Sequence, residues 1–273
     1  MTPFDYPPWL VMWGLAAALF AACKGFTLRG IRAPLRRKLA YSVAWPGLDV
    51  RGFCTAPSPP KPGAGEWLFA AAKTAFGVGV VFGVTPHLDP PLLRGWVGMV
   101  GILFVLHFGL FHLLSCGWRR AGVVAKPLMN WPILATSLAD FWARRWNTAF
   151  RDLTHRFLFR PLTPWLGAKA ALGVGFFVSG LVHELVISLP ANAGYGWPTL
   201  YFTLQGVGLL VERAVPRLRG RPFTALVVVG PAFGLFHPPF VERVVVPFLD
   251  WLTNPALAHG SSNPLWGFHT ARG

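Results

Sequence analysis

The sequence has few charged residues, and acids are the scarcer kind. Only 13% of its 273 residues are charged, with 10 Asp and Glu against 25 Lys and Arg. Soluble domains carry about 25% charged residues, so this composition argues against a soluble globular domain. Hydrophobic residues make up 53% of the chain, and 13 are Trp, a side chain that is typical of bilayer interfaces. The composition therefore indicates an integral membrane protein.

Cysteine is scarce, and the usual motifs of soluble enzymes are absent. The three cysteines form no CxxC pair and leave one unpaired, which argues against a disulfide framework: Cys23, Cys54 and Cys116. HExxH, GxSxG and Gly-rich phosphate loops do not occur. His112 and Cys116 are four residues apart, but two possible ligands do not make a zinc site, and we predict no metal. Asp5, with no Lys or Arg before the first apolar run, is unlike a cleavable signal peptide.

The sequence contains several long apolar runs that could cross a membrane as helices. A transmembrane helix needs about 20 mainly apolar residues. The candidate spans are Trp9–Cys23, Trp67–Val84, Leu92–Ser115, Trp165–Leu189, Pro198–Val211 and Phe223–Phe240, with Val244–Leu252 as a shorter one. We therefore predict one all-α, polytopic membrane domain over residues 1–273, with about seven to eight transmembrane helices and an amphipathic interfacial helix.

The basic residues predict an orientation. The net charge of +15 would also suit a nucleic-acid-binding protein, but most Lys and Arg lie beside apolar runs, in segments 24–51, 119–126, 144–160 and 213–221. The loops 85–91 and 190–197 contain neither residue. The positive-inside rule then places the N-terminus outside and the basic segments, with the Pro/Gly-rich loop 55–66, in the cytoplasm.

The stretch "SLADFWARRWN", residues 137–147, is polar and aromatic between apolar neighbours. Ser137 and Asp140 have the spacing of a capping box, which predicts a helix start. Helical periodicity over 137–157 separates a cationic stripe from an aromatic face, which predicts an amphipathic helix at the cytoplasmic interface. Its arginines could contact anionic lipid, or they could collect an anionic substrate such as a nucleotide-phosphate carrier. Thr163-Pro164 would begin the next span.

His183 and Glu184 lie inside that next span, where ionisable groups are costly. Ser179 and Gly180 share the helix face of His183, while Glu184 lies about 100° away and is expected to pair with another helix. Two readings stay open for His183. It is either a neutral side chain bonded to a neighbouring carbonyl, or a functional group.

These segments resemble the wax synthase-like branch of the membrane-bound O-acyltransferases, in the form of a bacterial member. The resemblance rests on "SLADFWARRWN" followed by "FVSGLVHEL", with weaker support from "AWPGLDVRGF", "TLQGVGLLVER" and "FGLFHPPFVERVVVPFL". It implies acyl transfer from acyl-coenzyme A (acyl-CoA) to an alcohol in the membrane. The family's histidine then maps onto His183 and its polar partner onto Asn147. Ala143 stands where many relatives have Gly, and the chain is short for the superfamily.

We therefore predict an acyl-CoA-dependent O-acyltransferase that esterifies a lipophilic alcohol. His183 is the general base, Asn147 is the second catalytic residue, and acyl-CoA is a co-substrate with no metal or resident cofactor. The expected substrate-binding residues are Trp142, Arg144, Arg145, Trp146, Arg151, Ser179 and Glu184. The expected location is the cytoplasmic membrane of a bacterium, among its lipids and without nucleic acid. The alternatives are O-acetylation of a polysaccharide or other exported glycan, and a transporter or scaffold without enzymatic activity.

Overall fold

Helices of several lengths make up the protein. The computed structural model describes residues 6–254, and that part of the chain contains no β-strand. The helices are α1 (Pro8–Leu28), α2 (Leu35–Ala44), α3 (Val50–Thr55), α4 (Ala64–Gly79), α5 (Pro91–Leu103), α6 (Phe111–Arg120), α7 (Leu138–Asp140), α8 (Thr148–Thr154), α9 (Arg160–His183), α10 (Leu189–Ala191), α11 (Trp197–Ala214), α12 (Arg221–Val229), α13 (Ala232–Leu235), α14 (Pro238–Phe240) and α15 (Val246–Thr253).

Short π and 3₁₀ segments join many of these helices end to end. The π segments are η1 (Val80–Val84), η3 (Phe104–Leu110), η5 (Phe141–Arg145), η6 (His155–Phe159), η7 (Glu184–Ser188) and η9 (Val241–Val245), and the 3₁₀ turns are η2 (Thr85–His87), η4 (Pro132–Leu134) and η8 (Pro216–Leu218). Single-turn π segments are often found at functional sites. Here η5, η6 and η7 flank the segments that contain Asn147 and His183.

The described residues contain fewer candidate membrane spans than we predicted. Four helical stretches are long and apolar enough: Pro8–Leu28, Ala64–His87, Pro91–Arg120 and Thr148–Ala191. A fifth is possible if Arg221–Leu235 and Pro238–Thr253, bent by 59°, form one broken span. The predicted count of seven to eight is therefore not confirmed. The predicted span Pro198–Val211 forms α11, which is less apolar because it extends to Glu212 and Arg213.

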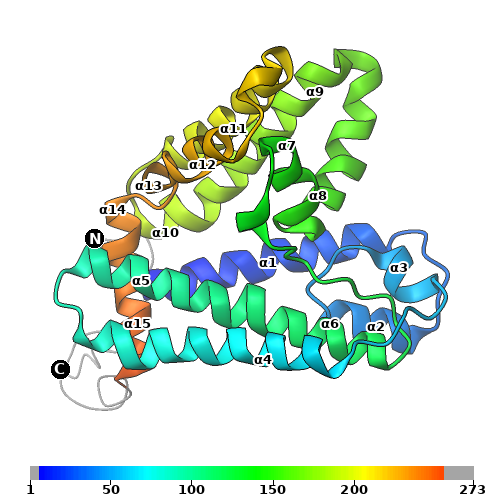
Figure 1. Cartoon of the computed structure of the whole chain (residues 1–273), viewed down its shortest axis with the longest axis horizontal. Coiled ribbons are helices and arrows are strands. Elements are labelled where there is room, and N and C mark those ends of the chain that lie inside the picture. The colour runs from blue at the N-terminus through cyan, green and yellow to red at the C-terminus, as the bar shows by residue number, and fades with distance from the viewer. Residues whose placement is uncertain (1–5, 255–273) are drawn as a thin grey trace, which may run out of the picture.

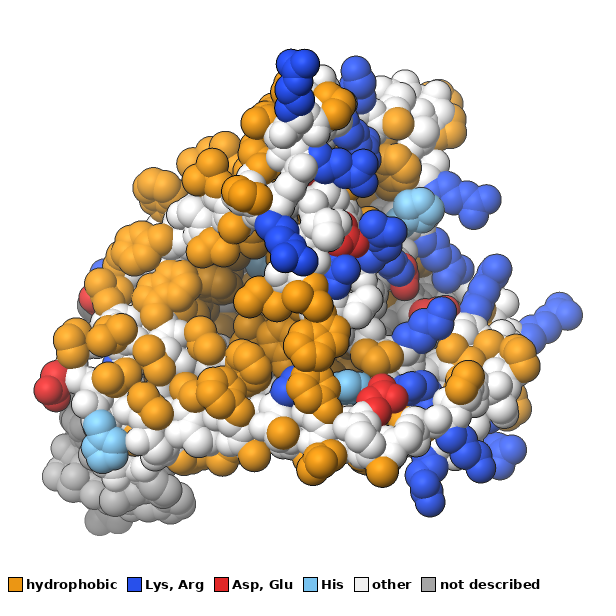
Figure 2. Space-filling view, in the orientation of Figure 1, with side chains coloured by type: hydrophobic (Ala, Val, Ile, Leu, Met, Phe, Trp, Pro, Cys, Tyr) orange, Lys and Arg blue, Asp and Glu red, His pale blue; other side chains and the backbone are white. Residues whose placement is uncertain are grey.

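The helices form a wedge (Figure 1). Helices α1, α4, α5 and α6 make one arm, α9, α11 and α12 make the other, and α7 and α8 lie between the arms toward their open end. Lys and Arg side chains gather at this open end, and hydrophobic side chains cover much of the rest of the visible face (Figure 2). That separation matches a protein with one end in water and its body in lipid.

The apolar core has two parts. One lies where the arms meet and includes Ile187, Phe202 and Val244, and the other lies at the basic end around Tyr41, Trp45 and Phe53. Lys24 is almost fully buried at the basic end, where its Nζ donates to the carbonyls of Trp45 (2.7 Å) and Gly47 (2.6 Å). These bonds replace the water that a buried ammonium group loses, and they fasten the 45–47 loop to α1.

The helix predicted over 137–157 is broken rather than continuous. Residues 138–145 form α7 and η5, the chain opens at Trp146, and Asn147 has a left-handed backbone (φ 37°, ψ 66°) before α8 begins. Backbone hydrogen bonds to the preceding segment 128–130 stabilise this break: Thr148 N donates to Leu128 O (3.0 Å), and Asn130 N donates to Arg145 O (2.8 Å). The predicted single stripe of polar residues therefore belongs to two helical pieces.

The next predicted boundary also differs. The helix does not begin at Thr163-Pro164. It runs continuously from Thr148 through η6, and Thr163 Oγ1 donates back to Phe159 O (2.6 Å). The change of direction comes at Gly167, whose φ of 74° and ψ of 161° are accessible mainly to glycine. A segment expected at the membrane surface is thus continuous with the span that contains His183.

Candidate functional site

The first turn of the 137–147 segment is fixed by two side chains. Ser137 Oγ accepts from Asp140 N (2.9 Å), as the capping spacing predicted. Glu212, on α11, accepts from Leu138 N (2.6 Å) and Ala139 N (3.1 Å), and its side chain is buried. The open amides of a helix N-terminus carry partial positive charge, so a carboxylate satisfies and stabilises them.

Asp140 then orients two arginines. Its side chain accepts from Thr136 N (3.1 Å), Arg144 Nε (2.9 Å) and Arg145 Nε (2.6 Å). Burial raises the pKa of this carboxyl, but the hydrogen bond from Arg145, that from the Thr136 amide and the two guanidinium charges outweigh burial and lower it. Arg145 also donates to the carbonyls of Asn130 and Trp131. Arg144 remains 68% exposed, so of the two it is the more available to a ligand.

Asn147 ends this segment and begins the next helix. Its Oδ1 accepts from Phe150 N (3.3 Å) as the cap of α8, and its backbone N donates to Met129 Sδ (3.3 Å). Asn tolerates the left-handed conformation better than most residues because its short amide bonds locally. Among residues 6–254, no acceptor binds its Nδ2 group, so two amide hydrogens remain for a ligand.

His183 has a defined ring orientation. Its Nδ1 lies 2.6 Å from the backbone oxygen of Ser179. A carbonyl oxygen can only accept, so Nδ1 must carry the proton, which leaves Nε2 of the neutral ring as the acceptor. The ring packs against Phe202 (centroids 4.2 Å apart) and Phe150 (6.5 Å). Both readings of the sequence are therefore compatible with the geometry, because the carbonyl bond leaves Nε2 uncommitted.

Glu184 pairs with another helix, as its position predicted. One of its oxygens, Oε1, accepts from Gly196 N (3.0 Å), Thr199 N (3.1 Å) and Thr199 Oγ1 (2.9 Å) at the start of α11. The two helices can approach because residue 180 is glycine, where a Cβ would lie 2.6 Å from Thr199 Cα. Glu184 therefore anchors α11 against the helix that contains His183.

A cavity of about 520 Å³ lies between these elements. Of the predicted site residues, it is lined by Trp142, Trp146, Asn147, Arg151 and Ser179. Arg144, Arg145, His183 and Glu184 are not among its lining residues, although His183 contacts Phe150 and Phe202, which are. The cavity thus brings the Asn147 segment and the His183 helix to one space.

The sequence did not single out some residues that line this cavity. Arg213 belongs to the basic segment 213–221, which we used only to predict the orientation, and His155 lies within the helix predicted over 137–157, where we gave it no role. The apolar wall comes mainly from Phe150, Leu172, Phe176, Phe202 and Leu209. Polar residues with a basic group and a mostly apolar wall are a common combination in pockets for amphipathic ligands.

Arg151 has a mixed environment. Its guanidinium forms an ion pair with Asp152 and donates to Ala143 O, on the preceding helical piece. These contacts fix its position on the cavity wall but neutralise part of its charge. Trp142, on the same wall, donates from Nε1 to Gln205 Oε1 (3.3 Å), which connects the 137–147 segment to α11.

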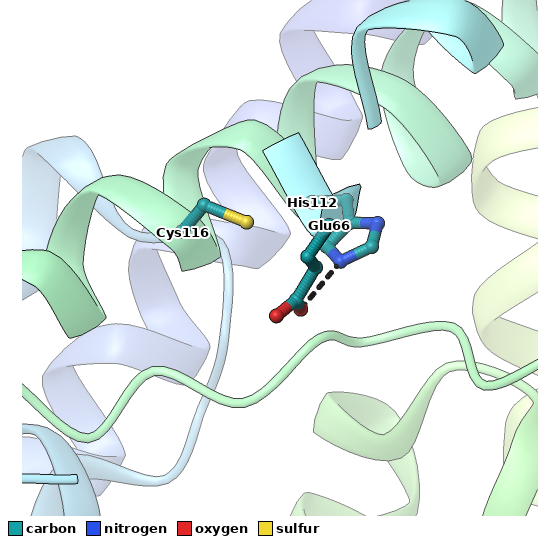
Figure 3. A group of neighbouring side chains, drawn as sticks. All are labelled: Glu66, His112 and Cys116. Carbon is teal, nitrogen blue, oxygen red and sulfur yellow. Dashed lines mark hydrogen bonds and ion pairs between the residues drawn. The ribbon is translucent and has the colours of Figure 1, made fainter. Parts of the chain in front are cut away.

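A separate polar cluster lies between α4 and α6 (Figure 3). Glu66, His112 and Cys116 offer ligand atoms within 4.8 Å of one another. However, His112 Nδ1 accepts from Lys73 Nζ (2.8 Å), His112 Nε2 donates to Glu66 Oε1 (2.9 Å), and Arg119 pairs with the same carboxylate. Two cations and a committed imidazole oppose a metal ion here, so the cluster reads as an ion-pair network between helices.

Residues 125–204 match the family model described as "Membrane bound O-acyl transferase family". The chain is 37% identical over 124 residues to "Probable long-chain-alcohol O-fatty-acyltransferase 2" of Arabidopsis thaliana, which covers 42% of this chain and 36% of that protein. It is 33% identical over 136 residues to "Long-chain-alcohol O-fatty-acyltransferase" of Simmondsia chinensis, covering 44% and 38%.

A third relative is named for a sterol rather than a long-chain alcohol. The chain is 33% identical over 160 residues to "Acyl-CoA--sterol O-acyltransferase 1" of Arabidopsis thaliana, which covers 52% of this chain and 46% of that protein. The chain thus spans less than half the length of these relatives. The family match includes both the Asn147 segment and His183.

Proposed function

We propose that the chain is an acyl-CoA-dependent O-acyltransferase that esterifies a lipophilic alcohol in a membrane. The observation that carries the proposal is the orientation of His183. Its Nδ1–H is committed to Ser179 O at 2.6 Å, which leaves Nε2 as a proton acceptor on a ring that packs against Phe150 and Phe202, two residues of the cavity that Asn147 also lines. The match over residues 125–204, and relatives named for long-chain alcohols and a sterol, support the acyl donor and the acceptor class.

The reaction needs one proton acceptor and one donor to an oxyanion. The alcohol oxygen attacks the thioester carbonyl while His183 Nε2 takes its hydroxyl proton. The carbonyl oxygen becomes negative in the tetrahedral intermediate, where an amide hydrogen of Asn147 Nδ2 can stabilise it. The C–S bond then breaks, the carbonyl reforms as an ester, and the imidazolium passes its proton to the leaving thiolate. No acyl-enzyme and no resident cofactor are required.

The lining of the cavity suits both parts of the donor. Arg151, His155 and Arg213 supply basic groups to it, which fits the phosphates of coenzyme A. Along α9, Ala171 and His183 are twelve residues apart, or roughly 18 Å at the helical rise. Aromatic and aliphatic residues cover the wall between, which suits the acyl chain and the alcohol. Arg144 is a further phosphate contact, and Arg145 positions the segment through Asp140.

The proposed orientation follows from the charges. The basic end of the wedge faces the cytoplasm, where acyl-CoA is found, and the N-terminus lies on the opposite side. In a bacterium this membrane would be the inner one. Cysteine labelling from each side of intact cells, at positions 32 and 193, tests the orientation. Labelling of position 32 from outside would contradict it.

The decisive experiment compares His183→Ala with His87→Ala, an exposed histidine outside the site. Membranes with matched expression receive labelled acyl-CoA and a fatty alcohol, and ester formation is measured. Loss of a general base lowers the rate roughly 10²–10⁴-fold, so we expect that loss in His183→Ala alone. Donor binding is measured separately, because a general base acts on turnover and not on donor affinity.

Three outcomes would overturn the proposal in different ways. An active His183→Ala protein would show that the histidine only packs. Transfer of acetyl groups to an exported glycan, with no lipid ester, would favour the glycan acetyltransferase. Absence of any transfer by the folded parent chain, over a range of alcohols and sterols, would favour a transporter or scaffold.

A further inference from the structure

A second, smaller cavity lies beside α8 and η6. Its volume is about 240 Å³, and it is lined by residues from distant parts of the sequence. The first group is Thr27 at the end of α1 and residues 48–51, and the second is residues 152, 153, 156, 157 and 160. Asp152 also lines the larger cavity, so the two cavities are neighbours that share one residue.

Three arginines line this smaller cavity: Arg51, Arg156 and Arg160. Within residues 6–254, none of them forms an ion pair with a carboxylate. The two acids of the lining are engaged elsewhere, since Asp49 Oδ1 accepts from Gly52 N (2.9 Å) and Asp152 pairs with Arg151. The lining thus holds three guanidinium groups against two aspartates, one of which is already paired with Arg151, so it carries a net positive charge, and a concave positive surface concentrates anions.

The wall behind the arginines is rigid. Leu48 and Val50 are buried in the cluster around Tyr41, and Lys24 clamps the preceding loop through Trp45 O and Gly47 O. This loop leads directly into α3, which includes Arg51. A site whose backbone is already fixed spends little free energy on ordering when a ligand binds. The three arginine side chains are themselves exposed, so this ordering comes from the backbone beneath Arg51.

We propose that this cavity is a phosphate-binding site in which Arg51, Arg156 and Arg160 hold the anion. Guanidinium groups suit a phosphate because each can donate two parallel hydrogen bonds to its oxygens. A phosphate could reach this end of the molecule from two sources, a nucleotide such as that of coenzyme A or the headgroup of an anionic lipid. The site stands on its own charges and geometry, and only the nucleotide source is linked to the proposed acyl transfer.

The test is a binding measurement that needs no turnover. The full chain is placed in nanodiscs of phosphatidylcholine, and the affinity for adenosine 3′,5′-bisphosphate is measured by calorimetry. The variants are Arg156→Gln with Arg160→Gln, and Arg51→Gln alone. The matched control is Arg36→Gln, an exposed arginine of the same basic region outside the cavity. We expect about tenfold weaker binding or more in the double variant and less than twofold change in the control.

A second arm separates the two sources. The same proteins are placed in nanodiscs that contain phosphatidylglycerol, and binding of a fluorescent phosphatidylglycerol analogue is measured. Arginine-dependent nucleotide binding in neutral nanodiscs identifies the nucleotide site, and arginine-dependent lipid binding identifies the headgroup site. Arg156→Lys with Arg160→Lys checks folding, since it keeps the charge and should retain part of the affinity. If neither probe binds less tightly to the folded Gln variants, the proposal is wrong.

Discussion

Asn147 has a backbone role and a proposed chemical role, and substitutions can separate them. Asparagine and alanine both have a Cβ at φ 37°, but the asparagine amide offsets the cost of this backbone; alanine would bear that cost, about 1–2 kcal/mol, and would lose the cap on Phe150 N, about 1 kcal/mol. Asn147→Ala should therefore lower the free energy of unfolding by about 2–3 kcal/mol. Glycine tolerates the positive φ and caps nearly as well, so Asn147→Gly should cost only a few tenths of a kcal/mol.

The chemical role predicts a different pattern. Both variants lack the side-chain amide, so both should lose turnover by about 10²–10³-fold, the usual effect of removing one oxyanion donor. Asn147→Asp offers a further contrast, since it keeps a capping oxygen but puts a carboxylate where the donor was. It should fold like the parent and lose turnover.

The assay combines thermal unfolding in detergent with ester formation at matched protein concentration. For a chain of this size, about 2–3 kcal/mol corresponds to a fall of roughly 4–12 °C in Tm, against about 2 °C or less for Asn147→Gly. Asn192, which also has a positive φ (47°) but lies outside the cavity, is the control, and Asn192→Gly should keep its turnover. If Asn147→Gly turned over like the parent, the amide would have no catalytic role and Asn147 would be only a helix cap.

Three further predictions concern stability. Glu212→Ala leaves two first-turn amides of α7 without their acceptor, which costs about 1–3 kcal/mol for each amide. Its Tm should therefore fall well below that of Glu242→Ala, a control at an exposed glutamate. Equal Tm values for the two variants would show that Glu212 does not stabilise this turn. The lowered pKa of Asp140 means that its stabilisation is present above its ordinary pKa of 3.8 and is lost as the pH falls through the lower folded value. Asp140→Asn should therefore destabilise the protein at pH 7 and much less in acid, and a pH-independent difference in unfolding would contradict this. Gly77→Ala places a Cβ 2.6 and 2.7 Å from backbone atoms of the facing helix, so it should lower the free energy of unfolding by about 1–3 kcal/mol. Gly79→Ala, whose Cβ would have nothing within 4 Å, should leave the thermal stability unchanged or raise it in the same unfolding experiment.

Local signals in the sequence predicted much of the helical arrangement. The spans of α1, of α4 and of α5 with α6 follow from long, mainly apolar runs, because a helix that faces lipid needs little besides length and hydropathy. The start of α7 at Ser137 follows from a spacing that acts within one turn. The partner of Glu184 on another helix follows from its angle to His183.

The break at Asn147 could not be predicted in the same way. Asparagine fits the polar stripe of a continuous helix as well as it fits a left-handed turn. The choice is made by Leu128 and Asn130, whose backbone hydrogen bonds hold the chain open from a segment about twenty residues away. The cavity and the place of Arg213 in it likewise depend on how α9 and α11 pack, and this is a tertiary property.

The contact between Glu212 and the first turn of α7 also sets an order of events during synthesis. The two amides leave the ribosome 74 and 73 residues before the carboxylate that binds them. Until α11 has been made, these two amides lack the acceptor that they have in the folded protein, and the wall of the cavity that contains Trp142 and Asn147 lacks its attachment to α11. A nascent chain of this protein therefore contains α1 to α6 well before it can complete the wall of this cavity. A chain halted before residue 212 should accumulate in the membrane with an unformed site, which limited proteolysis of arrested chains would detect as cleavage near residues 137–147.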